Sequence, residues 1–509
     1  MARYGTRRGL RGAVFALTAA GLLLTGCAGE GNRGASDSAH RGDYQPAPDG
    51  GRYGGGQGDE GDPSAREVAP SPDHLSTFAL DVDTASYGYA RRTLAEGRLP
   101  DPSTVRPEEF VNSFRQDYER PDDDGFSVTV DGARTDREDW SLLRVGLATR
   151  AAEGEEERPP AALTFVIDVS GSMSEPGRLD LAQRSLGVMT DNLREGDSVA
   201  LVTFSEEAET VLPMTRVGGN RDEIHAAVDS LEPARSTNLG AGVEQGYATA
   251  VEGLRRGATN RVVLVSDALA NTGDTDADTI LERVAGAREE YGITLFGVGV
   301  GSDYGDALME RLADRGDGHT TYVSEEKEAG EVFSEELPRN IDLTARDAKA
   351  QVAFDPATVE EFRLIGYDNR QVADDDFRDD SVDGGETGPG HTVTALYAVR
   401  TVPGAGGHLA TATVRWLDPD SRTPHEESGR IETKDLADSV WTAGPRFQIT
   451  TVAAYFADAL RRGAEGWDTL PGTPALGELA ERAEGLAGRT FDADVRELAE
   501  SIHRADRLT

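Results

Sequence analysis

The chain has 509 residues, which is long enough for two to four domains that each bury a core. Its 52 basic and 92 acidic residues give a formal charge of -40, which argues against nucleic acid or an anionic lipid surface as a partner and favours cations and basic proteins. The single cysteine, Cys27, excludes an internal disulfide framework and a zinc cluster built from cysteines.

The first 27 residues predict a lipoprotein signal peptide. An arginine-containing start precedes the apolar segment 13–24, which is far too short to span a bilayer. The segment closes with LTGC, which resembles the lipobox of bacterial lipoproteins, where the thiol of Cys27 would receive lipid. An ordinary secretory signal is the alternative, and Arg7 and Arg8 leave Sec or twin-arginine export open. We therefore expect an extracytoplasmic protein that a lipid anchors to the cell membrane.

Residues 28–72 predict a flexible tether, because Gly, Ser, Asp, Pro and Arg dominate and almost no aliphatic side chains are present to form a core. Residues 73–150 predict a small α+β region. It contains a short strand at 78–82, a helix capped by Asp83 or Thr84, and two strands in GFSVTVDGA and SLLRVGLAT.

Residues 161–341 alternate strands and helices, which is typical of a doubly wound, mostly parallel Rossmann-like α/β sheet. The apolar run 163–167 predicts a fully buried strand of the parallel type, and ETVLPM predicts one short antiparallel insertion. Residues 342–509 predict a β-rich region followed by three helices. Apolar stripes are expected to place two of these helices in a core, and they consist of Val452, Tyr455, Phe456, Ala459 and Leu460, and of Val495, Leu498, Ala499 and Ile502.

Oxygen-bearing side chains follow the strands of this central sheet. They are Asp168, Ser170 and Ser172 in IDVSGS, Thr237 in ARSTNLG, and Asp267 in VLVSD. Ligands bind at the carboxyl edge of an open α/β sheet, so these oxygens would converge there. Such a set suits Mg²⁺, or Mn²⁺ or Ca²⁺, with one position open for an incoming carboxylate. The alternative is that the three hydroxyls cap helices and the two acids are solvated loop ends.

Asp-x-Ser-x-Ser, then Thr, then Asp resembles the metal-ion-dependent adhesion site of the von Willebrand factor A (vWA) family. All five positions match, although this chain has Ala268 where the family often has glycine. The stretches STFALDVDTASYGYARR and FRLIGYDNRQVADDDF resemble the flanks of a bacterial lipoprotein subfamily called YfbK-like. The resemblance implies a non-enzymatic vWA domain whose bound ion is completed by an acidic residue of a protein partner.

Other functions stay open. The ion could serve only to stabilise a structural or envelope-assembly protein. A phosphatase-like hydrolase is the remote alternative, because Asp81 and Asp83 stand near the Asp-x-Asp-x-Thr/Val nucleophile pattern, which Ala85 breaks. The loop from Asp379 begins like an EF-hand but has Gly390 where a glutamate is required, which favours a surface loop.

Overall fold

The computed structural model describes residues 74–80, 84–121, 125–150, 158–267, 276–300, 309, 312, 320–323, 330, 332, 343–368, 370–380, 382, 384–419, 421–462 and 468–509. The predicted signal peptide with Cys27, the tether, and the acids Asp81 and Asp83 lie outside the described residues. No helix among the described residues is both long and apolar enough to cross a membrane.

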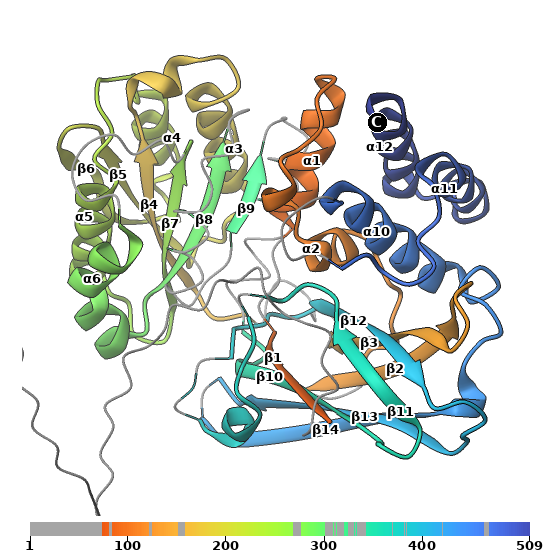
Figure 1. The fold of residues 1–509 in the computed structure, drawn as a ribbon. Helices are drawn as coiled ribbons and strands as arrows, with labels where there is room; N and C mark the ends of the chain where they lie inside the picture. The colour runs from red at the N-terminus through yellow and green to blue at the C-terminus, as the bar shows by residue number, and fades with distance from the viewer. Residues whose placement is uncertain are drawn as a thin grey trace, which may run out of the picture. The chain divides into compact units, whose positions relative to one another are not determined.

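The central part of the chain contains a six-stranded sheet in the order β6-β5-β4-β7-β8-β9 (Figure 1). Only β6 is antiparallel to its neighbour. The predicted doubly wound sheet with one antiparallel insertion is therefore confirmed. The strands are β4 (Ala161–Asp168), β5 (Ser198–Phe204), β6 (Ala208–Arg216), β7 (Thr259–Ser266), β8 (Thr294–Val300) and β9 (Thr320–Val323).

Helices cover both faces of this sheet, because alternate residues of β4 are apolar on both sides. Phe165 packs in one cluster with side chains of α3 and α4, and Val166 packs in another with side chains of α5 and α6. Every residue of β4 is buried, as predicted for a central parallel strand. The helices are η2 (Gly171–Ser174), α3 (Leu179–Asn192), α4 (Arg221–Asp229), α5 (Leu239–Glu252) and α6 (Ala277–Tyr291).

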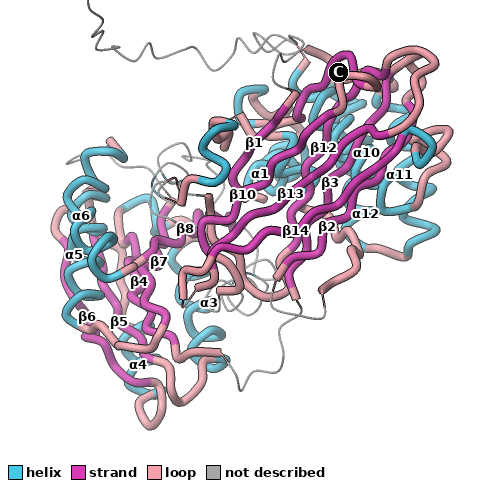
Figure 2. Tube along the Cα trace, turned by 90° about the horizontal axis from the view of Figure 1, so that it is seen from below, coloured by secondary structure: helices cyan, strands magenta, loops and turns pink. Residues whose placement is uncertain are grey.

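Two four-stranded antiparallel sheets, in the orders β1-β10-β13-β14 and β11-β12-β3-β2, form a sandwich (Figure 2). Their facing sides share one core, to which Phe78, Val145 and Val414 belong. β1 pairs with β10 and β3 with β12, so the segments on either side of the central sheet interleave in one structure. The strands are β1 (Leu75–Ala79), β2 (Phe126–Arg134), β3 (Trp140–Thr149), β10 (Arg346–Phe354), β11 (Val359–Leu364), β12 (Thr392–Thr401), β13 (His408–Leu417) and β14 (Pro424–Glu432).

A helical layer packs on the outer side of the β11-β12-β3-β2 sheet, where Leu142 and Leu396 share a core with Phe110 and Phe456. The two predicted stripes are buried there, except Ala459, which is half-buried. Their assignment to a core is confirmed. The helices of this layer are α1 (Ala85–Ala95), α2 (Pro107–Asn112), α10 (Pro445–Arg461), α11 (Leu476–Thr490) and α12 (Ala493–Leu508). The same parts of the chain also contain the short 3₁₀ turns η1 (Pro102–Thr104), η4 (Asp374–Arg378), which contacts β1 and β10, and η5 (Thr433–Asp435).

Candidate metal-binding site

The predicted ligands lie at the carboxyl edge of the central sheet. Asp168 ends β4, and Asp267 directly follows β7, the parallel neighbour of β4. Ser170 and Ser172 lie in the turn and the short helix η2 after β4, and their hydroxyl oxygens are 3.0 Å apart. Thr237 is buried in the loop before α5.

Backbone hydrogen bonds join the two loops that carry the hydroxyl groups. Val169 donates its N–H to the carbonyl of Phe204 (3.0 Å) and accepts from the N–H of Ala234 (2.5 Å). The N–H of Asn238 in turn donates to the carbonyl of Ser205 (2.7 Å). The loop with Thr237 is therefore tied to β5 and to the turn between Asp168 and Ser170.

Asp168 is fully buried, and both of its carboxylate oxygens accept hydrogen bonds. Oδ1 accepts from the N–H of Ser170 (2.8 Å), and Oδ2 accepts from the hydroxyl of Ser266 (2.6 Å). Burial raises the pKa of Asp168 to about 6, the neighbouring charge of Asp267 adds to the rise, and the two hydrogen bonds oppose it. Ser266 was not among the predicted site residues, although it directly precedes Asp267 in the sequence.

Arg178 is a further residue that the sequence prediction missed. Its Nη1 lies 2.6 Å from Oδ2 of Asp267, and both side chains are at most 3% exposed. The same Nη1 donates to the carbonyl of Ser172 (3.2 Å), and Nη2 lies 2.9 Å from Oε2 of Glu175. Arg178 could have been singled out from the sequence as a counter-charge for the site, because it is the only basic residue between the IDVSGS turn and Arg184.

The helix-capping alternative finds no support at the three predicted hydroxyl positions. Ser170 stands at the N-cap of η2 without a capping hydrogen bond, and α3 begins after Arg178 rather than after a serine. α5 is capped by Asn238, whose side chain accepts from the N–H of Ala241 (3.2 Å), and not by Thr237.

The residues brought together fit a hard cation. In the part of the chain that the structure describes, no group of three or more His, Cys, Asp or Glu side chains could hold a metal ion. An ion at this edge would therefore need the hydroxyl oxygens as well as the two carboxylates. An oxygen-only donor set of this kind is the chemistry that Mg²⁺, Mn²⁺ and Ca²⁺ prefer.

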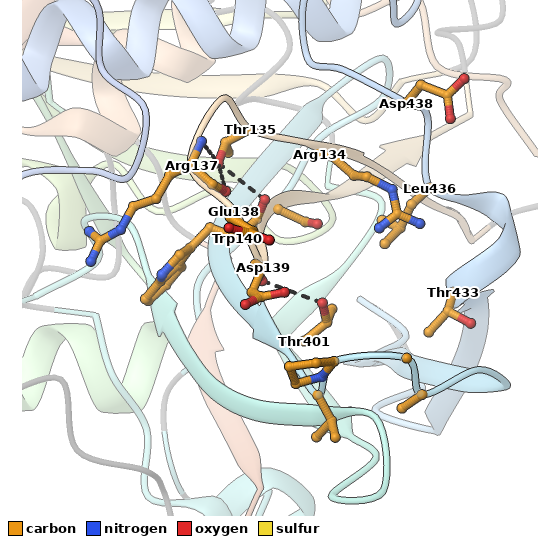
Figure 3. Close-up of a pocket in the computed structure, with 15 residues that line it drawn as sticks. Arg134, Thr135, Arg137, Glu138, Asp139, Trp140, Thr401, Thr433, Leu436 and Asp438 are labelled. Carbon is orange, nitrogen blue, oxygen red and sulfur yellow. Dashed lines mark hydrogen bonds between the residues drawn. The ribbon is translucent and has the colours of Figure 1, made fainter.

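Two other features lie outside this site. In the loop after Asp379, Nζ of Lys349 donates to the Asp379 carbonyl (2.6 Å), and Asp380 pairs with Arg415 (2.7 Å). A pocket of about 490 Å³ lies at the β2–β3 turn and the ends of β12 and β14 (Figure 3). The acidic residues that line this pocket, which we call the second pocket, are exposed, and none of them is a predicted ligand; they are Glu138, Asp139 and Asp438.

Comparisons with known proteins identify the same domain. Residues 162–335 match the family model "von Willebrand factor type A domain", residues 64–143 match "von Willebrand factor", and residues 340–500 match "Uncharacterized protein YfbK, C-terminal". The chain is therefore a vWA-domain protein, which confirms the predicted α/β fold class. Residues 340–500 match the C-terminal model of the YfbK family, which confirms the resemblance stated above.

Individual relatives show how far this similarity extends. The chain is 38% identical over 386 residues to "Uncharacterized protein YfbK" of Escherichia coli K12, across 74% of this chain and 65% of that protein. It is 28% identical over 183 residues to inter-alpha-trypsin inhibitor heavy chain H3 of Rattus norvegicus, across 33% and 20% of the two chains. A solved von Willebrand factor type A structure from Catenulispora acidiphila aligns with a TM-score of 0.47 and 17% identity, across 75% and 91%.

Proposed function

We propose that this protein binds a protein partner through a divalent ion held at the carboxyl edge of the vWA sheet, and that it is not an enzyme. Asp168, Ser170, Ser172, Thr237 and Asp267 are the proposed ligands, with Mg²⁺ as the ion and Mn²⁺ or Ca²⁺ as alternatives. The observation that carries the proposal is that two buried carboxylates and a pair of hydroxyl groups lie together at the carboxyl edge of the sheet. The domain class to which this sheet belongs generally mediates protein interactions.

The partner is proposed to complete the coordination with an acidic side chain. A hard cation accepts carboxylate oxygen readily, and Mg²⁺ exchanges a water for an incoming ligand. A purely structural ion is less well supported, because Arg178 already supplies positive charge to the buried Asp267. Capture of partners from an envelope lysate with and without a chelator separates the two roles, because a structural ion in a rigid domain would leave capture unchanged.

Substitution of Asp168 tests the ion directly. Asp168→Ala removes one carboxylate from the proposed donor set, and we expect it to abolish Mg²⁺ and Mn²⁺ binding by the full chain in titration calorimetry. The matched control is Glu138→Ala, in the second pocket, which Figure 3 shows. This variant should bind Mg²⁺ and Mn²⁺ as the unmodified protein does. Undiminished affinity in Asp168→Ala would place the ion elsewhere.

We also propose that lipid on Cys27 anchors the protein outside the cytoplasm. The support is the sequence of the first 27 residues, which carries a positive start, an apolar segment and LTGC. Cys27→Ala should lose all label in cells grown with a fatty-acid probe and should leave the protein unprocessed or released. Label that persists in the variant would contradict the anchor.

A further inference from the structure

A pocket of about 450 Å³ lies directly beside the proposed ion site. Val169, the residue between Asp168 and Ser170, lines it, and so does Ala234, which lies three positions before Thr237. The backbones of these two lining residues are hydrogen-bonded to each other. The turn that carries the proposed ligands is therefore also a wall of this pocket, which we call the acidic pocket.

The acidic pocket has a negative rim and a partly apolar lining. Glu207, Glu209 and Glu232 line it and are exposed, while no lysine or arginine lines it. Within the described residues, none of these glutamates takes part in an ion pair or a side-chain hydrogen bond. Val211 and Leu231 contribute apolar surface.

An unpartnered hydroxyl lies within the same pocket. Thr203 lines it, is only 6% exposed, and its side chain has no hydrogen-bond partner in the described part of the chain. In the β5–β6 pair, Thr203 stands directly opposite Glu209, so the two side chains share one face of the sheet. The hydroxyl is open to the pocket, so it can accept a hydrogen bond from a ligand that enters the pocket or donate one to it.

The charges decide which ligand. A lone carboxylate that approaches the ion over the wall shared with this pocket meets the negative charges of the three glutamates, which repel it. A cationic side chain beside that carboxylate turns the repulsion into attraction. Arginine fits the pocket best, because its stem can cover Val211 and Leu231 while its guanidinium donates to several carboxylates and to the Thr203 hydroxyl.

We infer that the partner presents a short segment in which a basic side chain, best an arginine, lies next to the acidic residue that reaches the ion. This inference rests on the proposed function, because the acidic residue requires the ion. Residues of an extended segment rise about 3.3 Å each and alternate in direction, so side chains two positions apart point the same way about 7 Å apart. The basic residue should therefore stand one or two positions from the acid.

Selection from a displayed library of random seven-residue peptides tests this inference. The full chain is immobilised with Mg²⁺, with chelator, or as the triple variant Glu207→Gln, Glu209→Gln, Glu232→Gln, whose changes lie at exposed positions. With Mg²⁺ we expect Asp or Glu to be enriched with Arg or Lys one or two positions away. On the triple variant the acid should remain enriched and the basic neighbour should not. Individual peptides should bind the variant about tenfold or more weakly, because charge-assisted hydrogen bonds are lost.

The controls distinguish the possible failures. The control is a triple variant that removes the same number of negative charges at the second pocket, Glu138→Gln, Asp139→Asn, Asp438→Asn. It should select the same peptides as the unmodified protein does. Acidic peptides without a basic neighbour, or a basic neighbour that the triple variant still selects, would overturn the inference and leave the ion site standing. Absence of any Mg²⁺-dependent acid enrichment would overturn the proposed function and the inference with it. A second bound Mg²⁺ that the triple variant loses would show that a cation, not a side chain, fills the pocket.

Discussion

Arg178 and Asp267 set the charge balance of the ion site at the scale of single residues. Both side chains are almost fully buried, and their charged atoms are 2.6 Å apart. Removing one partner of a buried pair leaves the other charge uncompensated, which costs about 3–5 kcal/mol. A divalent ion at the site would put positive charge beside the same carboxylate.

Arg178→Met should lower the free energy of unfolding of the metal-free protein by about 3 kcal/mol, measured in urea. Methionine keeps the apolar bulk but removes the positive charge that lies beside Asp267. Saturating Mg²⁺ should then raise the melting temperature more in the variant than in the unmodified protein, because the ion supplies the missing charge. Arg184→Met, which breaks an exposed pair with Asp180, should change stability by less than about 1 kcal/mol. Equal Mg²⁺ shifts in both proteins would contradict this role for Arg178.

The raised pKa of Asp168 predicts how ion binding depends on pH. Its pKa of about 6 exceeds the ordinary 3.8, so in the folded metal-free protein this group contributes stability that is fully present below pH 3.8 and is lost as pH rises through 6. A cation requires the anionic carboxylate. Mg²⁺ affinity should therefore be constant above pH 6 and fall about tenfold per pH unit below it. Calorimetry at pH 5, 6 and 7 measures this, and equal affinities at pH 5 and 7 would be inconsistent with the buried carboxyl described above.

At the scale of elements, two glycines set how closely α5 packs on the sheet. A Cβ on Gly242 would lie 2.6 Å from Cδ1 of Phe204, and a Cβ on Gly246 would lie 2.3 Å from Cγ2 of Val166. Both distances are shorter than carbon atoms tolerate. Because α5 begins two residues after Thr237, its close approach also positions this proposed ligand.

Gly246→Ala should destabilise the protein by about 1–3 kcal/mol in urea unfolding, because overpacking against Val166 outweighs the better helix propensity of alanine. The substitution should also displace α5 and with it Thr237, and so weaken Mg²⁺ binding. Gly286→Ala in α6 is the control, since no atom lies within 4 Å of its would-be Cβ, and it should stabilise by about 0.5–1 kcal/mol. The packing argument fails if both substitutions shift stability in the same direction.

At the scale of the whole molecule, one buried cluster joins the vWA sheet to the sandwich. Arg261 in β7 is fully buried, and its Nη2 lies 3.4 Å from Oε2 of Glu386. Arg346 in β10 lies 3.1 Å from the other oxygen of the same carboxylate. Burial lowers the pKa of Arg261, and the charge of Glu386 opposes this change. Glu386 is thus the anion that both arginines face.

Glu386→Gln should lower the free energy of unfolding by about 3 kcal/mol, because the fully buried Arg261 and the partly buried Arg346 lose their counter-charge. We expect scanning calorimetry to show separate transitions for the vWA domain and the sandwich, since the cluster contributes to their coupling. Glu426→Gln is the control, because Glu426 also faces two arginines, Arg378 and Arg415, but within the sandwich and at a more exposed position. A calorimetric trace unchanged by Glu386→Gln would show that the cluster does not couple the two parts.

The features that depend on short-range pattern could be predicted from the amino-acid sequence. The apolar run of β4 predicted a buried parallel strand, and the stripes of α10 and α12 predicted core helices, because periodicity reports which side chains of one element avoid water. The order Asp168, Ser170, Ser172, Thr237 and Asp267 located the candidate site, since strand ends of a parallel sheet meet at one edge.

Which segments these elements pack against became known only from the folded structure. The pairing of β1 with β10 and of β3 with β12 joins parts of the chain that are distant in sequence. Arg178 pairs with Asp267, which lies 89 positions further along the chain. The acidic pocket likewise forms only when β5, β6 and the loop before α5 come together. Periodicity identifies a buried face but not its neighbour, because strand pairing, ion pairs and pockets depend on contacts between residues that the sequence does not place side by side.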